Sequence, residues 1–136
     1  MTDTPQPKDF DCKVALVTGA SRGIGESTAR LLAARGAHVI VSSRRQESVD
    51  EVAGSIVEAG GQATAIACHV GDEAAIEAAF ARIAADFGRL DVLVNNAATY
   101  PHFGHIAETP LTMVDKTVEV NIRGYFHASQ KAALMM

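Results

Sequence analysis

The residues of this chain that are best suited to chemistry form a glycine-rich segment, TGASRGIG, at positions 18–25. It follows an apolar run and precedes a helical pattern that begins at Ile24. The glycines leave the backbone without side chains, so a pyrophosphate can come close, and the free N–H groups at the helix start then face its negative charge. The segment therefore predicts a phosphate-binding turn. Its candidate contacts are Thr18, Gly19, Ser21, Arg22, Gly23, Ile24 and Gly25.

A second group of polar residues lies at the end of the next apolar run and reads Ser42-Ser43-Arg44-Arg45. In dinucleotide-binding folds an acidic residue here accepts hydrogen bonds from the adenosine ribose and selects NAD. A 2′-phosphate is held instead by arginine and hydroxyl donors, and a carboxylate would repel it. Because no carboxylate is present, the sequence predicts NADP(H) as the cofactor, held by Arg22, Ser43 and Arg44. Arg45 is interpreted as a solvated residue at a helix start.

The histidines and cysteines form no pattern typical of a metal site. His102 and His105 stand three positions apart with no third ligand nearby in the sequence, an arrangement that seldom binds a metal. Cys12 and Cys68 are the two cysteines, and they do not form a CxxC pair. We therefore predict no metal site and no disulfide framework, which fits a reducing compartment.

Alternating strand and helix patterns must position these residues. Short apolar runs predict strands at 14–18, 37–43, 63–70 and 90–94. Apolar residues at helical spacing predict helices at 24–35, 49–57 and 76–87, and a last helix that starts at an N-cap, Thr112, with Asp115 three residues on. This alternation predicts an α/β fold, the first half of a Rossmann-type, doubly wound parallel sheet with strand order 3-2-1-4 and helices on both faces. The ligand crevice is expected between the first and fourth strands.

Composition and charge limit the domain organisation and the partners. We expect a loose N-terminal tail at 1–10 and a single nucleotide-binding domain at 11–136. A net charge of −4 argues against nucleic acid and against anionic membranes, because both need a basic surface. No segment has the roughly 20 consecutive apolar residues of a membrane span. The chain is therefore expected to be soluble and cytoplasmic.

Three motifs together resemble the short-chain dehydrogenase/reductase family: G-x-x-x-G-x-G after Thr18, NNAA at 95–98, and VNIRG around Asn121. They occur in the family's order and spacing over nearly the whole chain. The resemblance implies hydride transfer between NADP(H) and a small carbonyl or alcohol substrate, with Asn95 and Ala97 at the cofactor site. It implies that Asn95 steadies the central sheet and that Asn121 is a catalytic residue holding a water in a proton relay. Without the resemblance, Asn121 would be interpreted as a helix asparagine bonded to a local carbonyl.

The end of the third predicted strand departs from the family pattern. It reads His69-Val70, where most members have an aspartate that accepts a hydrogen bond from the adenine amino group, followed by a small apolar residue. Both residues are candidate cofactor contacts, and a neutral His69 would either accept one such bond or point to solvent. The segments SSRRQESVD, CHVG and NAATYPHFG resemble the branch of NADP-dependent carbonyl and retinal reductases. In the family, the loop that holds His102 and Phe103 lines the substrate space, although a surface loop is the alternative.

The family's catalytic tyrosine stands four residues before a lysine, and neither tyrosine of this chain does so. Position 104 is glycine after Tyr100, and position 129 is serine after Tyr125. We therefore expect the 136-residue chain alone to be inactive, to lack the catalytic half, and to fold poorly, dimerise or aggregate, whereas the full-length enzyme would be a homo-oligomer. The alternative function is a non-catalytic dinucleotide-binding or regulatory module. A methyltransferase-type Rossmann domain is less favoured, because the glycine spacing and the basic second strand oppose it.

Overall fold

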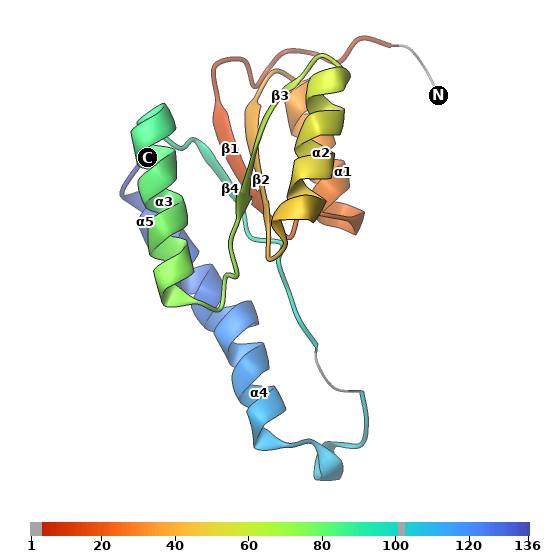
Figure 1. Ribbon diagram of the computed structural model, residues 1–136, viewed down its shortest axis with the longest axis vertical. Helices are drawn as coiled ribbons and strands as arrows, with labels where there is room; N and C mark the ends of the chain where they lie inside the picture. Colours follow the sequence, from red (N-terminus) through yellow and green to blue (C-terminus); the bar gives the residue numbers. More distant parts are fainter. Residues whose placement is uncertain (1–3, 101–102) are drawn as a thin grey trace.

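A parallel sheet forms the centre of the molecule, in a computed structural model that describes residues 4–100 and 103–136 (Figure 1). Its four strands lie in the order β3-β2-β1-β4. The strands are β1 (Val14–Thr18), β2 (His38–Ser43), β3 (Gln62–Ala67) and β4 (Val92–Val94). The helices are α1 (Gly23–Ala34), α2 (Gln46–Glu58), α3 (Glu73–Phe87), α4 (Leu111–Val118) and α5 (Tyr125–Ala133), with a 3₁₀ turn η1 (Ile106–Glu108) and a π-helical turn η2 (Glu119–Gly124). The predicted fold class and strand order are confirmed.

The two faces of the sheet bury separate apolar clusters because successive strand residues point to opposite sides. Val17, Val39 and Val41 face α1 and α2, where they meet alanines of α1 and valines of α2. Leu16 and Ile40 belong to the other cluster, which α3 and α5 cover. Figure 1 shows α1 and α2 on one side of the sheet and α3 and α5 on the other. The sheet is therefore fully covered at its centre, as parallel sheets require.

The strand β4 begins later than its apolar residues suggest. The backbone N–H of Asp91 donates to the carbonyl of Val14 at 2.8 Å, and the Asp91 carboxylate accepts from the Val14 N–H at 2.8 Å. Arg89 holds the same carboxylate with two hydrogen bonds. A side chain thus replaces one backbone pairing, and regular pairing starts only at Val92 opposite Ala15. The predicted start of this strand at 90 is wrong for that reason.

The predicted end of the third strand is also wrong. The strand β3 stops at Ala67, three residues before the predicted end at 70. Cys68 still donates its N–H to the carbonyl of Ser43, but the His69 carbonyl then accepts from the N–H of Asp72 in a turn. His69 and Val70 consequently lie in the loop between β3 and α3, beyond the strand.

The last helix differs from its prediction at both its start and its middle. It begins at Leu111 after Pro110, with no side-chain cap, so Thr112 lies inside the first turn and is not the N-cap. At its middle, η2 interrupts the α-helical hydrogen bonding. In that turn Gly124 packs so closely on Val70 that a Cβ would stand 2.6 Å from the Val70 carbonyl oxygen. Tertiary contact there overrides the local spacing on which the prediction depended.

The segment before β1 contacts the end of α1. The Nζ atom of Lys8 donates to the Ala34 carbonyl at 2.8 Å, and Asp9 forms an ion pair with Arg35. The guanidinium of Arg35 lies over the Phe10 ring, 5.9 Å from its centroid. These contacts begin before the predicted domain boundary at residue 11, which stays a prediction. In the described part of the chain, no helix combines the length and apolarity needed to cross a membrane.

Candidate functional site

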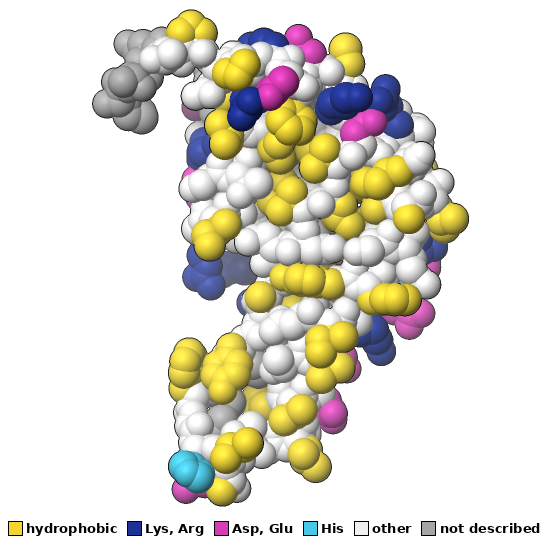
Figure 2. Space-filling model, turned by 180° about the vertical axis from the view of Figure 1, so that it is seen from behind, with side chains coloured by type: hydrophobic (Ala, Val, Ile, Leu, Met, Phe, Trp, Pro, Cys, Tyr) yellow, Lys and Arg dark blue, Asp and Glu magenta, His cyan; other side chains and the backbone are white. Residues whose placement is uncertain are grey.

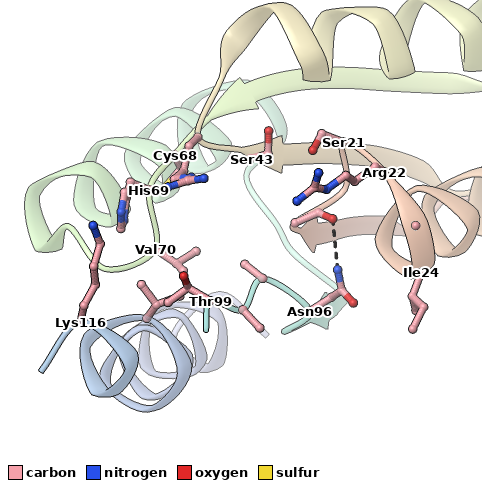
Figure 3. A pocket seen from close by; sticks show the side chains of 16 residues that line it. Ser21, Arg22, Ile24, Ser43, Cys68, His69, Val70, Asn96, Thr99 and Lys116 are labelled. Atoms are coloured by element: carbon pink, nitrogen blue, oxygen red, sulfur yellow. Dashed lines mark hydrogen bonds between the residues drawn. The ribbon is translucent and has the colours of Figure 1, made fainter. Parts of the chain in front are cut away.

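A pocket of about 350 Å³ lies at the carboxyl ends of the strands, close to where β1 and β4 meet (Figure 3). Its walls come from the turn after β1, the ends of β2 and β3, the loop after β4, and the helix α4 with η2. The strand order reverses between β1 and its two neighbours, and ligands of open α/β sheets bind in the crevice at such a point. The pocket thus lies where the ligand crevice was expected.

The glycine turn supplies one wall of this pocket, lined by Gly19, Ser21, Arg22, Gly23 and Ile24. Gly19 and Gly23 have φ angles of +63° and +59°, a left-handed conformation that strains other residues. A Cβ on Gly23 would meet no heavy atom within 4 Å, so the backbone there is open to the pocket. This is the surface that a pyrophosphate needs in order to approach the start of α1.

Gly25 and Thr18 support the turn from behind and do not line the pocket. A Cβ on Gly25 would stand 2.2 Å from the carbonyl oxygen of Gly19, so the turn can close only on a glycine. The Thr18 hydroxyl accepts the N–H groups of Asn96 and Ala97 at 3.1 and 3.0 Å and lies 3.3 Å from the carbonyl of Val94, to which it donates. Thr18 therefore joins the turn to the loop after β4.

Asn96, the neighbour of Asn95, joins the loop after β4 to the glycine turn. Its Nδ2 donates to the carbonyls of Thr18 and Gly19, each at 3.1 Å, and the residue lines the pocket. Asn95 instead donates to the Ser129 hydroxyl at 3.0 Å, and its buried Oδ1 has no partner among the described residues. Adjacent residues in extended backbone point to opposite sides, so only one of the pair can reach the turn. The steadying role of Asn95 stays a prediction, and Asn96 is the residue that joins the loop to the glycine turn.

The end of β2 brings basic and hydroxyl groups to the pocket. Ser43 and Arg44 line it together with Arg22, and Figure 3 shows Ser21, Arg22 and Ser43 at the same end. Among the described residues neither Arg22 nor Arg44 has an ion pair or a side-chain hydrogen bond, so both guanidinium groups are available to a ligand. Arg45 is exposed, forms an ion pair with Glu47 at 3.6 Å, and does not line the pocket.

The loop after β3 contributes Cys68, His69 and Val70. The Nδ1 atom of His69 accepts the backbone N–H of Gly71 at 3.0 Å. Because Nδ1 already acts as an acceptor, the proton of the neutral ring sits on Nε2, which then donates. This geometry removes the acceptor that an adenine amino group would need from the neutral ring. Burial, and secondarily the charge of Asp72, raises the pKa of the Cys68 thiol to about 11, so it is protonated at neutral pH.

Asn121 lies outside the pocket but holds a residue that lines it. Its Oδ1 accepts the N–H of Thr99 and its Nδ2 donates to the Thr99 carbonyl, both at 2.8 Å. Thr99, Ala97 and Ala98 line the pocket, so Asn121 fixes this stretch of the loop from η2. Its polar side-chain atoms thus bond to a residue 22 positions away in another element, and not to a local carbonyl of the helix.

Sequence reasoning missed several residues of the pocket wall. Asn96 could have been found, because two asparagines ended the fourth apolar run and either could reach the turn. Lys116 and Val120 could not, because they reach the pocket only through the way α4 and η2 pack against the sheet. Cys68 was overlooked because it was considered only as a metal or disulfide residue.

Of the two histidines in the loop after β4, the structure describes only one. His102 lies outside the described residues. His105 is exposed, and its Nδ1 accepts the N–H of Ala107 at 3.2 Å. Within residues 4–100 and 103–136 there is no group of three or more His, Cys, Asp or Glu side chains that could hold a metal ion.

Known proteins resemble this chain over most of its length. The family model for short chain dehydrogenases matches residues 13–136. A bovine (Bos taurus) protein, dehydrogenase/reductase SDR family member 4, is 42% identical over 84% of this chain, which covers 41% of that protein. The chain thus spans about half or less of the length of the curated relatives it matches.

Solved structures agree with the sequence match. A short chain dehydrogenase from Burkholderia cenocepacia J2315 in complex with NADP is 40% identical, with a TM-score of 0.87 over 93% of this chain and 52% of that one. An NAD⁺-bound xylitol dehydrogenase is 31% identical, with a TM-score of 0.89 over 95% of this chain and 50% of that one. The fold, the glycine turn and these matches agree, and the chain belongs to the short-chain dehydrogenase family.

Proposed function

We propose that this chain is the NADP(H)-binding half of an oxidoreductase that transfers hydride between NADP(H) and a carbonyl or alcohol substrate. One observation carries the choice of NADP(H) over NAD. The pocket carries Arg22 and Arg44 with Ser43 at the end of β2, and none of its described lining residues is a carboxylate. A dianionic 2′-phosphate matches this donor set, and an unphosphorylated ribose does not need it.

Each wall of the pocket has a separate task in this proposal. The open backbone at Gly23 and the N–H groups at the start of α1 bind the pyrophosphate. Arg22, Ser43 and Arg44 hold the 2′-phosphate, and their charge-assisted hydrogen bonds are each worth about 1.5–3 kcal/mol. A relative of similar fold was solved in complex with NADP, whereas another was solved with NAD⁺, so the basic residues and not the family decide the preference.

The loop after β4 orients the reactive end of the cofactor. When bound, the nicotinamide supplies or accepts the hydride. Asn96 ties the loop to the glycine turn, and Asn121 clamps Thr99 through two hydrogen bonds. We therefore propose that Asn121 is a positioning residue that fixes the pocket wall at Ala97–Thr99. The role of holding a water in a proton relay stays a proposal for this position.

The family resemblance implies that turnover needs a tyrosine four residues before a lysine, which supplies the proton. Neither Tyr100 nor Tyr125 is followed by lysine at the fourth position, so residues 1–136 alone would bind NADP(H) without reducing a substrate. The carbonyl or alcohol substrate, the cytoplasmic location and the homo-oligomeric state of the full-length enzyme belong to the same proposal. A non-catalytic binding module is the alternative, and absence of turnover by the full-length protein with a panel of ketones and aldehydes would favour it.

Calorimetric titration of the full-length protein with NADPH and with NADH tests the proposed cofactor. We expect NADPH to bind about tenfold more tightly or better, since one charge-assisted hydrogen bond corresponds to about that ratio. Equal affinities, or tighter binding of NADH, would contradict the preference. Failure of both to bind would contradict the dinucleotide site itself.

A further inference from the structure

The purine base of a bound dinucleotide should meet the loop after β3, an inference that rests on the proposed function. The pyrophosphate belongs at the turn after β1 and the ribose at the end of β2. Since β3 lies beyond β2 in the sheet, a nucleotide that continues outward in the same pocket reaches Cys68, His69 and Val70. Figure 3 shows His69 and the end of Lys116 on the same side of the pocket, away from Ile24.

The ring of His69 is fixed as a donor on its free edge. A backbone N–H can only donate, so the 3.0 Å contact from Gly71 requires a lone pair on Nδ1. In the neutral ring the hydrogen is therefore on Nε2. Gly71 makes this arrangement possible, because a Cβ there would stand 2.8 Å from Cε1 and 3.1 Å from Nδ1 of His69.

Two backbone carbonyls of this wall face other parts of the protein. The His69 carbonyl accepts the N–H of Asp72 at 2.9 Å. The Val70 carbonyl oxygen lies against Gly124, 2.6 Å from where a Cβ on that glycine would be. Of the neighbouring side chains, Lys116 is a donor only and Cys68 is a protonated thiol, at best a weak acceptor. This end of the pocket thus offers donors and few acceptors.

We propose that His69 lets the pocket accept adenine and hypoxanthine alike, by donating its Nε2–H to an acceptor on the base edge. Adenine presents ring nitrogens as acceptors and one exocyclic amino group as a donor. A wall of donors uses the ring nitrogens and makes no hydrogen bond to the amino group. Hypoxanthine carries a carbonyl in place of the amino group and a hydrogen on N1, so its O6 takes the place of N1 as the acceptor on that edge. A donor on the protein then finds an acceptor on either base, and the exchange costs little.

The test compares the dissociation constants of NADPH and of its hypoxanthine analogue, deamino-NADPH, for the full-length protein. We expect the two to agree within about threefold for the wild type. His69→Asp replaces the donor by an acceptor, and we expect it to favour adenine by about tenfold or more, the value of one hydrogen bond. Any loss that the added charge causes cancels in the ratio, because both ligands carry the same phosphates.

His105→Asp is the matched control, because His105 also accepts an N–H two residues on through Nδ1, yet does not line the pocket. It should leave the ratio unchanged. His69→Ala, which has neither donor nor acceptor, should keep the ratio near that of the wild type but raise both dissociation constants, by up to about tenfold, through the loss of one hydrogen bond. Unchanged dissociation constants for both ligands would show that His69 does not donate to the base. A wild-type preference for adenine of tenfold or more, or a ratio that His69→Asp does not alter, would overturn the inference. Failure of NADPH itself to bind would overturn the proposed function, and the inference with it.

Discussion

Arg44 and Arg45 are neighbours in the sequence, yet the fold gives them different surroundings. Arg44 lines the pocket, whereas Arg45 is exposed at the start of α2 and pairs with Glu47. A basic dipeptide alone does not say which of its members meets a ligand. The end of β2 decides it, because the chain leaves the sheet there and turns into the helix.

Replacing one pocket arginine should selectively weaken the binding of the phosphorylated cofactor. We expect Arg44→Ala to raise the dissociation constant for NADPH by about ten- to a hundredfold, the loss of one charge-assisted contact, with little change for NADH. Arg45→Ala is the control and should alter neither constant. Calorimetric titration of each variant with both dinucleotides measures this, and an equal loss for NADPH and NADH would speak against a phosphate contact.

At the scale of residues, the sequence predicted the kinds of chemical group at the site better than the partners that each side chain contacts. The basic end of β2 and the glycine turn could be identified because charge and the missing side chains act over short stretches of chain. The two asparagines after β4 were both candidates for contact with the turn, but which of them reaches it depends on the side of the extended backbone that faces the turn, and the sequence does not show this. The tautomer of His69 likewise follows from one hydrogen bond to Gly71.

The turn between β1 and α1 holds together only if one helix residue has no side chain. A Cβ on Gly25 would stand 2.2 Å from the Gly19 carbonyl oxygen and 2.5 Å from Nδ2 of Asn96. We expect Gly25→Ala to lower the free energy of unfolding of the full-length protein by about 1–3 kcal/mol through overpacking. It should also weaken NADPH binding, because the turn must open to admit the methyl group.

Gly54 offers a matched comparison within another helix. It lies inside α2, and a Cβ there would meet nothing within 4 Å. Gly54→Ala should therefore raise the free energy of unfolding by about 0.5–1 kcal/mol, the usual difference between these residues in a helix. Urea unfolding of both variants checks the pair. If Gly25→Ala were as stable as Gly54→Ala, the close packing of the turn would be refuted.

The junction of β4 with β1 should make stability depend on pH. The hydrogen bonds of Arg89, and then the Val14 N–H, hold the pKa of the Asp91 carboxyl below its usual value. A carboxylate with a lowered pKa stabilises the fold above the pKa of the unfolded chain, about 4, and the contribution is lost as the pH falls through the folded value.

Asp91→Asn should therefore unfold more easily than the wild type at pH 7, and the difference should shrink at acid pH. Urea unfolding at pH 7 and near pH 3 measures both differences in the free energy of unfolding. The same difference at the two pH values would show that the charge of Asp91 does not contribute.

At the scale of elements, hydrophobic periodicity predicted each strand and the first three helices, because burial on a parallel sheet imposes it. The ends of elements were predicted less well. The strand β4 starts late because a carboxylate replaces a backbone partner, and η2 exists because Gly124 packs against Val70. Such contacts join residues far apart in the chain, so local patterns do not contain them.

On the scale of the whole molecule, one helical surface is largely exposed among the residues that the structure describes. Figure 2 shows hydrophobic side chains gathered over the narrow end of the molecule, which holds α4. Four apolar side chains at helical spacing along α4, η2 and α5 are 43 to 67% exposed: Val114, Val118, Ile122 and Phe126. Surfaces of this kind are typical of sites that another surface covers.

A polypeptide of residues 1–136 should therefore self-associate. We expect gel filtration to show dimers or larger species at micromolar concentration, and Ile122→Lys with Phe126→Lys to shift the population towards the monomer. Val57→Lys on α2, where the side chain is 54% exposed, is the control and should not. A monomer that melts sharply at low concentration would contradict the expectation.

The fold of the whole molecule was the most predictable property. Alternation of strands and helices, with right-handed crossovers, leaves few possible topologies, and the observed order β3-β2-β1-β4 is the one expected. The pocket at the reversal of strand order follows from that topology. Its far wall, made by α4 and η2, needed the structure.

The most direct test of the NADP(H) site is a crystal structure of the full-length protein with NADP⁺. We predict the pyrophosphate at the backbone of Gly23 and the start of α1. The 2′-phosphate should lie within hydrogen-bond distance of Arg22, Ser43 or Arg44. A dinucleotide bound elsewhere, or a 2′-phosphate pointing into solvent away from both arginines, would contradict the assignment of this pocket as an NADP(H) site.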